Sequence, residues 1–297
     1  MDPYGGFTMR NIETFAVIGG DLRSAYLAGL LAADGYKVIT SGFDSTDLPP
    51  CVTGCTNPAQ AASLADCVIL PLPVTTDGSN INAPFSRVRI TLDQVLNVLK
   101  PEQGLVGGAV SDSVRHEVEG RGLTIHDYLK REELAVSNAV PTAEGAIQLA
   151  MEELPITISG ARCLVTGFGR VAGTLSRLLV ALGADVTVAA RRFSDLARAQ
   201  THGCAAIELA DLPRAGDFDV IFNTVPVLLF SREILQNMDK NTLLIDLASK
   251  PGGVDFNAAA ELQLKTIWAL SLPGRVAPKS AGAIIKTAIL NMIKEGL

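Results

Sequence analysis

Residues 162–192 read RCLVTGFGRVAGTLSRLLVALGADVTVAARR, and this stretch decides the fold of the region around it. The apolar, β-branched run CLVTG predicts a buried strand, LSRLLVALG predicts a helix that Gly183 ends, and VTVAA predicts a second strand. The glycines of GFGRVAG therefore lie between a strand and a helix of one βαβ unit. In that context a glycine-rich turn indicates a dinucleotide-binding site rather than an ordinary turn.

The small residues of this turn have separate predicted roles. Gly167 permits the tight turn, and Gly169 lets the backbone approach a pyrophosphate. Ala172 and Gly173 let the helix pack closely on the sheet. The helix N-terminus offers free N–H groups to the phosphates. The predicted cofactor contacts in this turn are Gly167, Phe168, Gly169, Arg170 and Val171.

The end of the second strand indicates which nicotinamide cofactor is bound. An NAD site usually has Asp or Glu there to bind the ribose hydroxyls. This chain instead has Arg191 and Arg192 after two alanines, and the first acidic residue after this strand is Asp195. Arginine at this place can hold a 2′-phosphate through paired, charge-assisted hydrogen bonds. We therefore predict that Arg191 and Arg192 bind NADP; the alternative is a solvated arginine pair on a loop.

Two later strands of the same region end in polar or glycine-rich segments. GDFDVIFNTVP covers residues 216–226, and NTLLIDLASKPGG covers residues 241–253. Ligands of open α/β sheets bind at the carboxyl ends of the strands. The further predicted cofactor contacts are therefore Asn223, Thr224, Val225, Pro226, Leu247, Ala248 and Ser249.

The first half of the chain contains a second βαβ pattern. FAVIGG (15–20) predicts a strand, DLRSAYLAGLLAADG (21–35) an amphipathic helix, and YKVIT (36–40) another strand. The connecting turn, GGDLR, lacks the full glycine pattern, so we interpret this unit as a nucleotide-fold relative that no longer binds a nucleotide. Asp21 can cap the helix, and the helix N-terminus remains a candidate site for a carboxylate. The alternative is that Asp21 only caps the helix and Arg23 lies on the surface.

Alternating strands and helices continue through the first half of the chain. We predict strands at 67–71 and 104–110, a helix over 91–101 that Pro101 stops, and a helix from Ser111. Six alternating elements by residue 126 describe a complete α/β domain. The fold class is therefore α/β, with two Rossmann-like doubly wound parallel-sheet domains joined by two bridging helices.

The predicted domains follow from this order. Residues 1–140 form an N-terminal substrate domain, residues 141–280 an NADP-binding Rossmann domain, and residues 281–297 a C-terminal helix that returns to the first domain. The first bridge is a helix that Thr142 caps, starting near Ala143 and ending at Pro155. The second bridge is the final helix.

Composition excludes several classes of partner. The 297 residues carry a formal net charge of −6 without a basic stripe, so no nucleic-acid partner is expected. No apolar run approaches the roughly 18 residues of a membrane span. The first fourteen residues contain no signal-peptide core, and Met9 offers a second start. The chain is expected to be cytoplasmic and reduced.

The five cysteines do not form a recognisable metal motif. Cys67 and Cys163 begin strand-like runs and are expected in the core. Cys51 and Cys55 form a CxxxC pair in a loop with no second pair, so no metal site is expected.

Six motifs spread over nearly the whole chain resemble the family of the dipicolinate synthase A-subunit. They are GGDLR (19–23), DYLKREELAVSNAVPTAEGAI (127–147), the dinucleotide unit, NTVP (223–226), DLASKPGG (246–253) and LPGRVAPKSAG (272–282). The resemblance implies an NADP-dependent oxidoreductase in the mother cell of a sporulating bacterium. There, with the flavoprotein-like B-subunit of dipicolinate synthase, it converts dihydrodipicolinate from the lysine branch to pyridine-2,6-dicarboxylate.

The layout also resembles dehydrogenases that act on shikimate, methylenetetrahydrofolate or 2-hydroxy acids. The 2-hydroxy-acid enzymes use a histidine late in the chain, but the last histidine here is His202. The methylenetetrahydrofolate enzymes need an early lysine base, and Lys37 lies inside a predicted strand. These two activities are therefore disfavoured.

The implied reaction moves a hydride from a dicarboxylate ring to nicotinamide and releases a proton, so the protein mainly positions the ring and balances charge. Two carboxylates require cationic, hydroxyl or helix-end donors. The substrate-binding candidates are Arg23, Thr75, Thr76, Ser111, Lys250 and Arg275. The catalytic candidates are Asn138, Thr142 and Glu144, with Glu144 or Asp127 as proton acceptor. Each candidate has the alternative of being a cap or a surface residue.

Two alternatives stay open at this point. If the substrate enters as the hydrated tetrahydro form, water must also leave, and no residue is assigned to that step. The other alternative is that the chain is a non-catalytic NADP-binding partner that stabilises the B-subunit. It stays open because the sequence contains no undisputed catalytic base. A homodimer also stays open.

Overall fold

The computed structural model describes residues 12–214 and 217–297, and the chain divides into two compact units. Unit 1 comprises Met1–Ser137 and Ala277–Leu297, and unit 2 comprises Asn138–Val276. The chain leaves unit 1 within helix α5 (Glu132–Glu153) and re-enters it just before helix α11 (Pro278–Lys294). Met9, the second start considered above, lies outside the described residues.

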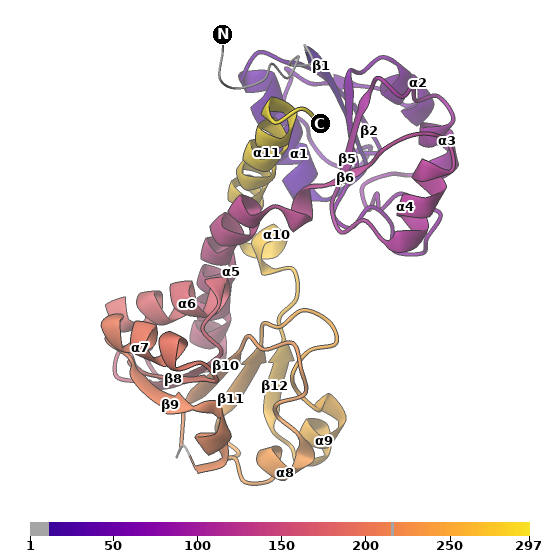
Figure 1. The fold of residues 1–297 in the computed structure, drawn as a ribbon. Coiled ribbons are helices and arrows are strands. Elements are labelled where there is room, and N and C mark those ends of the chain that lie inside the picture. Colours follow the sequence, from indigo (N-terminus) through magenta and orange to yellow (C-terminus); the bar gives the residue numbers. More distant parts are fainter. Residues whose placement is uncertain (1–11, 215–216) are drawn as a thin grey trace. The chain divides into compact units, whose positions relative to one another are not determined.

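Unit 1 contains a sheet with helices beside it (Figure 1). The sheet is parallel, and its six strands follow the order β3-β2-β1-β4-β5-β6. Besides the start of α5 and the whole of α11, its elements are β1 (Thr14–Ile18), α1 (Leu22–Ala33), β2 (Lys37–Ser41), β3 (Thr53–Gly54), α2 (Pro58–Ser63), β4 (Cys67–Ile69), α3 (Leu92–Leu96), β5 (Gly104–Gly107), α4 (Asp112–Glu119), β6 (His126–Asp127) and the 3₁₀ turn η1 (Tyr128–Lys130).

Unit 2 contains a second sheet with helices beside it (Figure 1). This sheet is also parallel, and its six strands follow the order β12-β11-β10-β7-β8-β9. Its elements are β7 (Arg162–Thr166), α6 (Arg170–Ala181), β8 (Asp185–Ala190), α7 (Phe193–Thr201), β9 (Ala205–Glu208), η2 (Leu209–Arg214), β10 (Val220–Asn223), α8 (Arg232–Leu235), β11 (Leu243–Asp246), α9 (Phe256–Glu261), β12 (Lys265–Trp268) and α10 (Leu272–Val276). Taken from the other edge, this is the strand order of unit 1. The predicted pair of Rossmann-like doubly wound sheets is confirmed.

Both sheets are buried on both faces, which explains their continuous apolar strands. In β7, Cys163 and Val165 pack into a cluster with α5, α6 and α7, while Leu164 packs into the opposite cluster with α8 and α9. In β1, Phe15 packs towards α1 and α11, and the next residue, Ala16, packs towards α2, α3 and α4. Cys163 and also Cys67 are fully buried, as predicted.

Two predicted helix boundaries and one predicted helix cap are wrong. The helix expected to start near Ala143 begins at Glu132 and continues through Pro141, so Thr142 lies inside α5 and does not cap it. The local proline and threonine signals were overridden because α5 buries one face along both halves, from Leu134 to Ala150. The helix predicted to stop at Pro101 ends at Leu96.

Two helical glycines have opposite surroundings. A Cβ placed on Gly282 of α11 would lie 2.7 Å from the carbonyl oxygen of Arg23 and 3.1 Å from the nitrogen of Leu27, so α11 packs backbone-to-backbone on α1. A Cβ placed on Gly173 of α6 would meet no atom within 4 Å. The prediction that Gly173 is needed for close packing is therefore wrong, whereas fully buried Ala172 does pack in the core.

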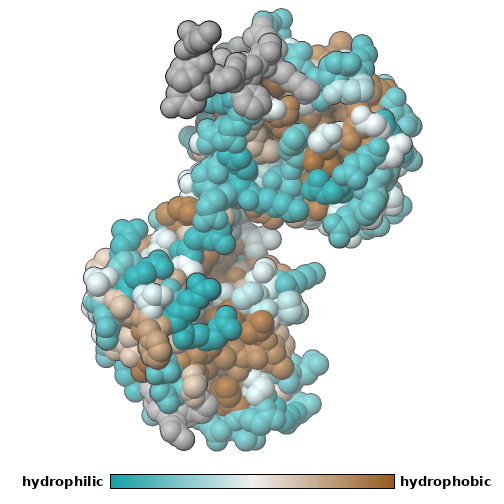
Figure 2. Space-filling model, in the orientation of Figure 1, coloured by the Kyte–Doolittle hydropathy of each residue, from teal (hydrophilic) through white to brown (hydrophobic). Residues whose placement is uncertain are grey.

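The surface of unit 2 shows hydrophobic side chains among hydrophilic ones (Figure 2). The loop after β10 contributes to the exposed apolar surface of the unit, since Val227 and Leu228 are both exposed. No helix within residues 12–214 and 217–297 is long and apolar enough to span a membrane.

The different surroundings of Gly282 and Gly173 predict opposite effects of substitution by alanine on the free energy of unfolding. Gly282→Ala should lower the free energy of unfolding by about 1–3 kcal/mol, because the new methyl group meets immovable backbone. Gly173→Ala should raise it by about 0.5–1 kcal/mol, because alanine restricts the unfolded chain and finds open space. Chemical denaturation measures both. Trp268, the single tryptophan, reports on unit 2 by fluorescence, and circular dichroism reports on the whole chain. Changes of the same sign would contradict this account.

Candidate functional site

The glycine turn of unit 2 leaves a helix N-terminus open. Gly167 follows β7 with a φ of 84°, a conformation that glycine adopts without strain. Gly169 is the N-cap of α6 and provides no side-chain cap. A Cβ placed on Gly169 would meet no atom within 4 Å, so the space in front of the turn is free. A helix N-terminus without a side-chain cap, next to open space, is what a pyrophosphate requires.

A cavity of about 240 Å³ lies beside this turn. Among the predicted cofactor contacts, the structure brings Gly167, Phe168, Gly169, Arg191, Arg192, Thr224, Val225 and Pro226 together around it. Ala190, Asp195 and Leu209 complete the lining. Arg170 and Val171 start α6, and Leu247 to Ser249 follow β11; none of these five lines the cavity. The residues that line it come from four stretches of unit 2: 167–169, 190–195, Leu209 and 224–226.

Arg191 and Arg192 give this cavity an unbalanced positive charge. Both side chains are exposed, and neither forms an ion pair with any residue of the described chain. The neighbouring acid, Asp195, pairs with Arg198 at 3.4 Å instead. Arg192 is also the N-cap of α7 and makes no side-chain cap bond. The cavity can therefore attract an anionic group such as a phosphate.

Phe168 contributes its backbone rather than its side chain. Its ring is 4% exposed and packs against α7. The guanidinium carbon of Arg198 lies 5.3 Å from the ring centroid, and the His202 ring lies 5.5 Å from it. The ring therefore anchors the glycine turn to α7.

The carboxyl ends of three central strands are joined by buried side chains. Thr166, Asn223 and Asp246 end β7, β10 and β11, and each is 0% exposed. The Thr166 hydroxyl donates to Asn223 Oδ1 at 2.6 Å, and Asn223 Nδ2 donates to Asp246 Oδ1 at 2.8 Å. Asn223, predicted to contact the cofactor, is thus enclosed in this network. Asp246 was missed, although the motif DLASKPGG contained the signal.

The corresponding turn of unit 1 is filled. A Cβ on Gly19 would lie 2.9 Å from the Ile81 side chain and 3.1 Å from the Asn82 carbonyl oxygen. A Cβ on Gly20 would overlap the Ser24 hydroxyl. The Gly20 N–H donates to the Asn82 carbonyl at 2.8 Å. The chain's own segment thus occupies the place that a phosphate would need, which supports the interpretation that unit 1 binds no nucleotide.

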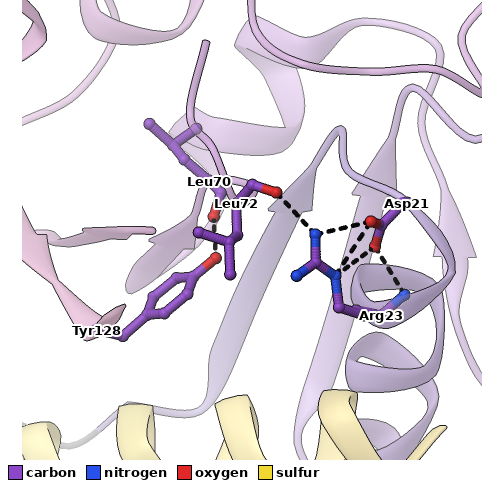
Figure 3. A network of polar contacts seen from close by, with 5 residues as sticks. All are labelled: Asp21, Arg23, Leu70, Leu72 and Tyr128. Carbon is purple, nitrogen blue, oxygen red and sulfur yellow. Dashed lines mark hydrogen bonds and ion pairs between the residues drawn. The ribbon is translucent and has the colours of Figure 1, made fainter. Parts of the chain in front are cut away.

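Asp21 and Arg23 form a closed pair at this filled turn (Figure 3). Asp21 caps α1 by accepting from the Arg23 N–H at 2.9 Å, so this helix N-terminus is not available to a carboxylate. The Arg23 guanidinium is bound to the Asp21 carboxylate at 2.8 Å and donates to the Leu72 carbonyl at 2.9 Å. Arg23 is 8% exposed. The alternative that placed it on the surface is wrong, and its charge is balanced within unit 1.

Tyr128 lies in the same network (Figure 3). Its hydroxyl donates to the Leu70 carbonyl at 3.1 Å. Burial raises the pKa of this phenol well above its ordinary value, so it stays neutral. Together with Arg23 it fixes the segment that follows β4.

Most of the other polar candidates in unit 1 have local structural partners. The Thr75 hydroxyl accepts from the Gly78 N–H at 2.8 Å, and the Ser111 hydroxyl caps α4 by accepting from the Val114 N–H at 3.3 Å. The Asp127 carboxylate accepts from the backbone N–H groups of Ala109, Val110 and Leu129. Asp127 is therefore a loop-fixing residue rather than a free proton acceptor.

The candidate side chains in unit 2 differ in whether they already have a partner within the chain. The Thr142 hydroxyl donates to the Asn138 carbonyl at 2.7 Å within α5. Glu144 is exposed and lines a different cavity, with Met151 of α5 and Leu182 after α6, while the cofactor turn precedes the other end of α6. Lys250 and Arg275 are exposed and have no hydrogen-bond or ion-pair partner among the described residues. They are the two cations available to a carboxylate ligand among the predicted substrate contacts.

Two family models match the chain, one in each unit. Residues 14–129 match the N-terminal domain of the dipicolinate synthase A-subunit, and residues 154–260 match a putative NAD(P)-binding domain. The second match covers the glycine turn and all segments that line the cavity.

Comparison with known proteins extends this likeness to nearly the whole chain. Transhydrogenase from Sinorhizobium meliloti shares the fold, with a TM-score of 0.71 at 17% identity over 94% of this chain and 93% of that chain. The crystal structure of the dipicolinate synthase A-subunit from Bacillus halodurans gives a TM-score of 0.87 at 31% identity, covering 95% of this chain and 97% of that chain. The dipicolinate synthase A-subunit of Bacillus subtilis is 32% identical over 94% of this chain and 95% of its own length. The chain therefore belongs to the family of the dipicolinate synthase A-subunit.

Proposed function

We propose that this chain is the NADP-dependent oxidoreductase component of a dipicolinate synthase. It oxidises dihydrodipicolinate, or its hydrated tetrahydro form, to pyridine-2,6-dicarboxylate. It acts with the dipicolinate synthase B-subunit in the mother cell of a sporulating bacterium. The observation that carries this proposal is family membership over nearly the whole chain, and the open, arginine-lined cavity beside the glycine turn supports it.

The chain's own groups suit the binding of NADP. The N–H groups at the start of α6 face the space that a pyrophosphate needs, and Gly169 keeps that space clear. Arg191 and Arg192 supply charge for a 2′-phosphate where an NAD site would carry an acid. When bound, the nicotinamide supplies the hydride acceptor for the reaction.

The substrate's carboxylates require cations that are not already paired. Lys250 and Arg275 meet this condition, so they are the preferred substrate contacts of this proposal. Arg23 is a weaker candidate because Asp21 already balances its charge. The hydroxyls of Thr75 and Ser111 already accept hydrogen bonds from backbone N–H groups nearby, so they would have to bind the substrate in addition to these partners. Asn138 and Thr142 remain proposals for the catalytic role, while Glu144 lines another cavity.

One observation favours the alternative of a non-catalytic NADP-binding partner. Among the predicted proton acceptors, Asp127 is bound by three backbone N–H groups and Glu144 lies away from the cofactor turn. The deciding experiment mixes the dihydrodipicolinate branch product and NADP with this chain, with the B-subunit or with both, and follows NADPH absorbance and pyridine-2,6-dicarboxylate. Turnover by the chain alone supports the catalytic proposal. Turnover by the B-subunit alone, at a rate that adding this chain and NADP does not change, refutes it.

The arginine pair generates a test of cofactor choice. Replacing Arg191 and Arg192 by alanine should weaken NADPH binding by about 1–3 kcal/mol, since hydrogen bonds to charged groups are of that size, and should leave NADH binding nearly unchanged. Titration calorimetry with both cofactors measures this. Arg177→Ala, which removes an exposed arginine on α6 that does not line the cavity, is the control. Equal losses for NADPH and NADH would contradict NADP selectivity.

The two glycines of the turn generate a second test. Gly169→Val should abolish dinucleotide binding and leave the melting temperature near that of the wild type, because the new side chain enters the open phosphate space. Gly167→Ala should lower both, because its φ is positive and its methyl group would lie 2.8 Å from the Thr224 hydroxyl. A Gly169→Val protein that binds NADP with wild-type affinity would show that the turn is misassigned.

A further inference from the structure

We infer that Thr166, Asn223 and Asp246 are positioning residues that shape the cofactor cavity from behind without contacting the cofactor. This inference rests on the proposed NADP binding. It gives Asn223 a role different from the direct contact predicted from the sequence, and it adds Thr166 and Asp246, which no prediction included.

The side-chain amide of Asn223 has no capacity left for a ligand. Its Oδ1 accepts from the Thr166 hydroxyl at 2.6 Å and from the Val225 N–H at 3.1 Å. Its Nδ2 donates to Asp246 Oδ1 at 2.8 Å and to the Val225 carbonyl at 3.1 Å. Both donors and both acceptor sites are used, and the residue is 0% exposed. A role through other residues is therefore the one that its geometry allows.

Val225 transmits the position of Asn223 to the cavity. Asn223 binds both the N–H and the carbonyl of Val225, and Val225 lines the cavity with its neighbours Thr224 and Pro226. The Thr224 hydroxyl in turn donates to the Thr166 carbonyl at 2.7 Å. The place of a Cβ on Gly167 is 3.2 Å from the Val225 side chain. The loop after β10 is thus held against the glycine turn, and a shift of Asn223 would move the cavity wall.

Asp246 anchors the network on its other side. Its carboxylate accepts from the Ala248 N–H at 3.0 Å and the Gly253 N–H at 2.8 Å, which folds the loop after β11 back on itself. A Cβ on Gly253 would overlap the Asn223 amide, so only glycine permits this approach. Asp246 therefore holds the loop that carries exposed Lys250 and, through Asn223, the loop that carries Val225.

The main test uses two buried threonines on the same sheet. Thr166→Val removes the hydroxyl that binds Asn223. Thr242→Val removes a hydroxyl that donates to the Phe218 carbonyl at 2.7 Å. Thr242 lies just before β11, at the amino ends of the strands, whereas Thr166 lies at their carboxyl ends. Both substitutions should lower the melting temperature. Thr166→Val alone should raise the Kd for NADP, by about three- to tenfold for one lost hydrogen bond, measured well below both melting temperatures.

A swapped pair tests the link between Asn223 and Asp246. Asn223→Asp places two carboxylates face to face, and Asp246→Asn leaves one backbone N–H without its acceptor. Each should weaken NADP binding by more than about tenfold. The double variant restores an amide–carboxylate hydrogen bond between the two positions. It should therefore bind NADP more tightly than Asn223→Asp alone, a coupling that independent sites would not show.

The outcomes separate this inference from the proposed function. A wild-type Kd for Thr166→Val, equal losses for Thr166→Val and Thr242→Val, or multiplicative losses in the swapped pair would overturn the positioning role. A wild-type chain that binds neither NADP nor NAD would overturn the proposed function and this inference with it. Selective loss in Thr166→Val with partial recovery in the double variant would support both.

Discussion

The hydrogen bond from the Asn223 amide to the Asp246 carboxylate is the interaction on which the cofactor side of unit 2 depends. It joins the carboxyl ends of neighbouring strands β10 and β11 at 2.8 Å in a fully buried position. A buried carboxylate is costly unless donors surround it, and Asp246 has the amide and two backbone N–H groups. Because each donor belongs to a different part of the two loops, satisfying the carboxylate also fixes the shape of both loops.

The two units show how one strand order leads to different uses of the same edge. Both sheets place their first and fourth strands side by side at the centre, and each first strand ends in a glycine turn before a helix. In unit 2 the helix start has no side-chain cap and faces open space. In unit 1 Asp21 caps the helix, and the Asn82 carbonyl takes the turn's N–H. The two turns therefore differ in whether the chain itself fills the space in front of the helix, and not in strand order.

Charge follows the same division. In unit 1 the cation at the turn, Arg23, is neutralised by Asp21 and buried with neutral Tyr128. In unit 2 Arg191 and Arg192 have no acidic partner among the described residues, because the nearby Asp195 pairs with Arg198. An unpaired cation beside a free helix N-terminus favours a polyanionic ligand. The electrostatic and steric features of unit 2 thus support the same class of cofactor.

The sequence alone determined the features that depend on neighbours along the chain. The strand–turn–helix pattern around Gly167 and Gly169, the arginines after β8 and the alternation of apolar strands with helices predicted both sheets and most of the cavity lining, because each of these signals lies within a short stretch of the chain. Only the tertiary structure decided the rest. The side chains that bind the Asn223 amide lie 57 and 23 residues away, at Thr166 and Asp246. Helix α5 continues through Pro141 because buried packing along its face outweighs a local stop signal. Which side chains are free to bind a ligand depends on contacts between distant segments, and no local pattern records those contacts.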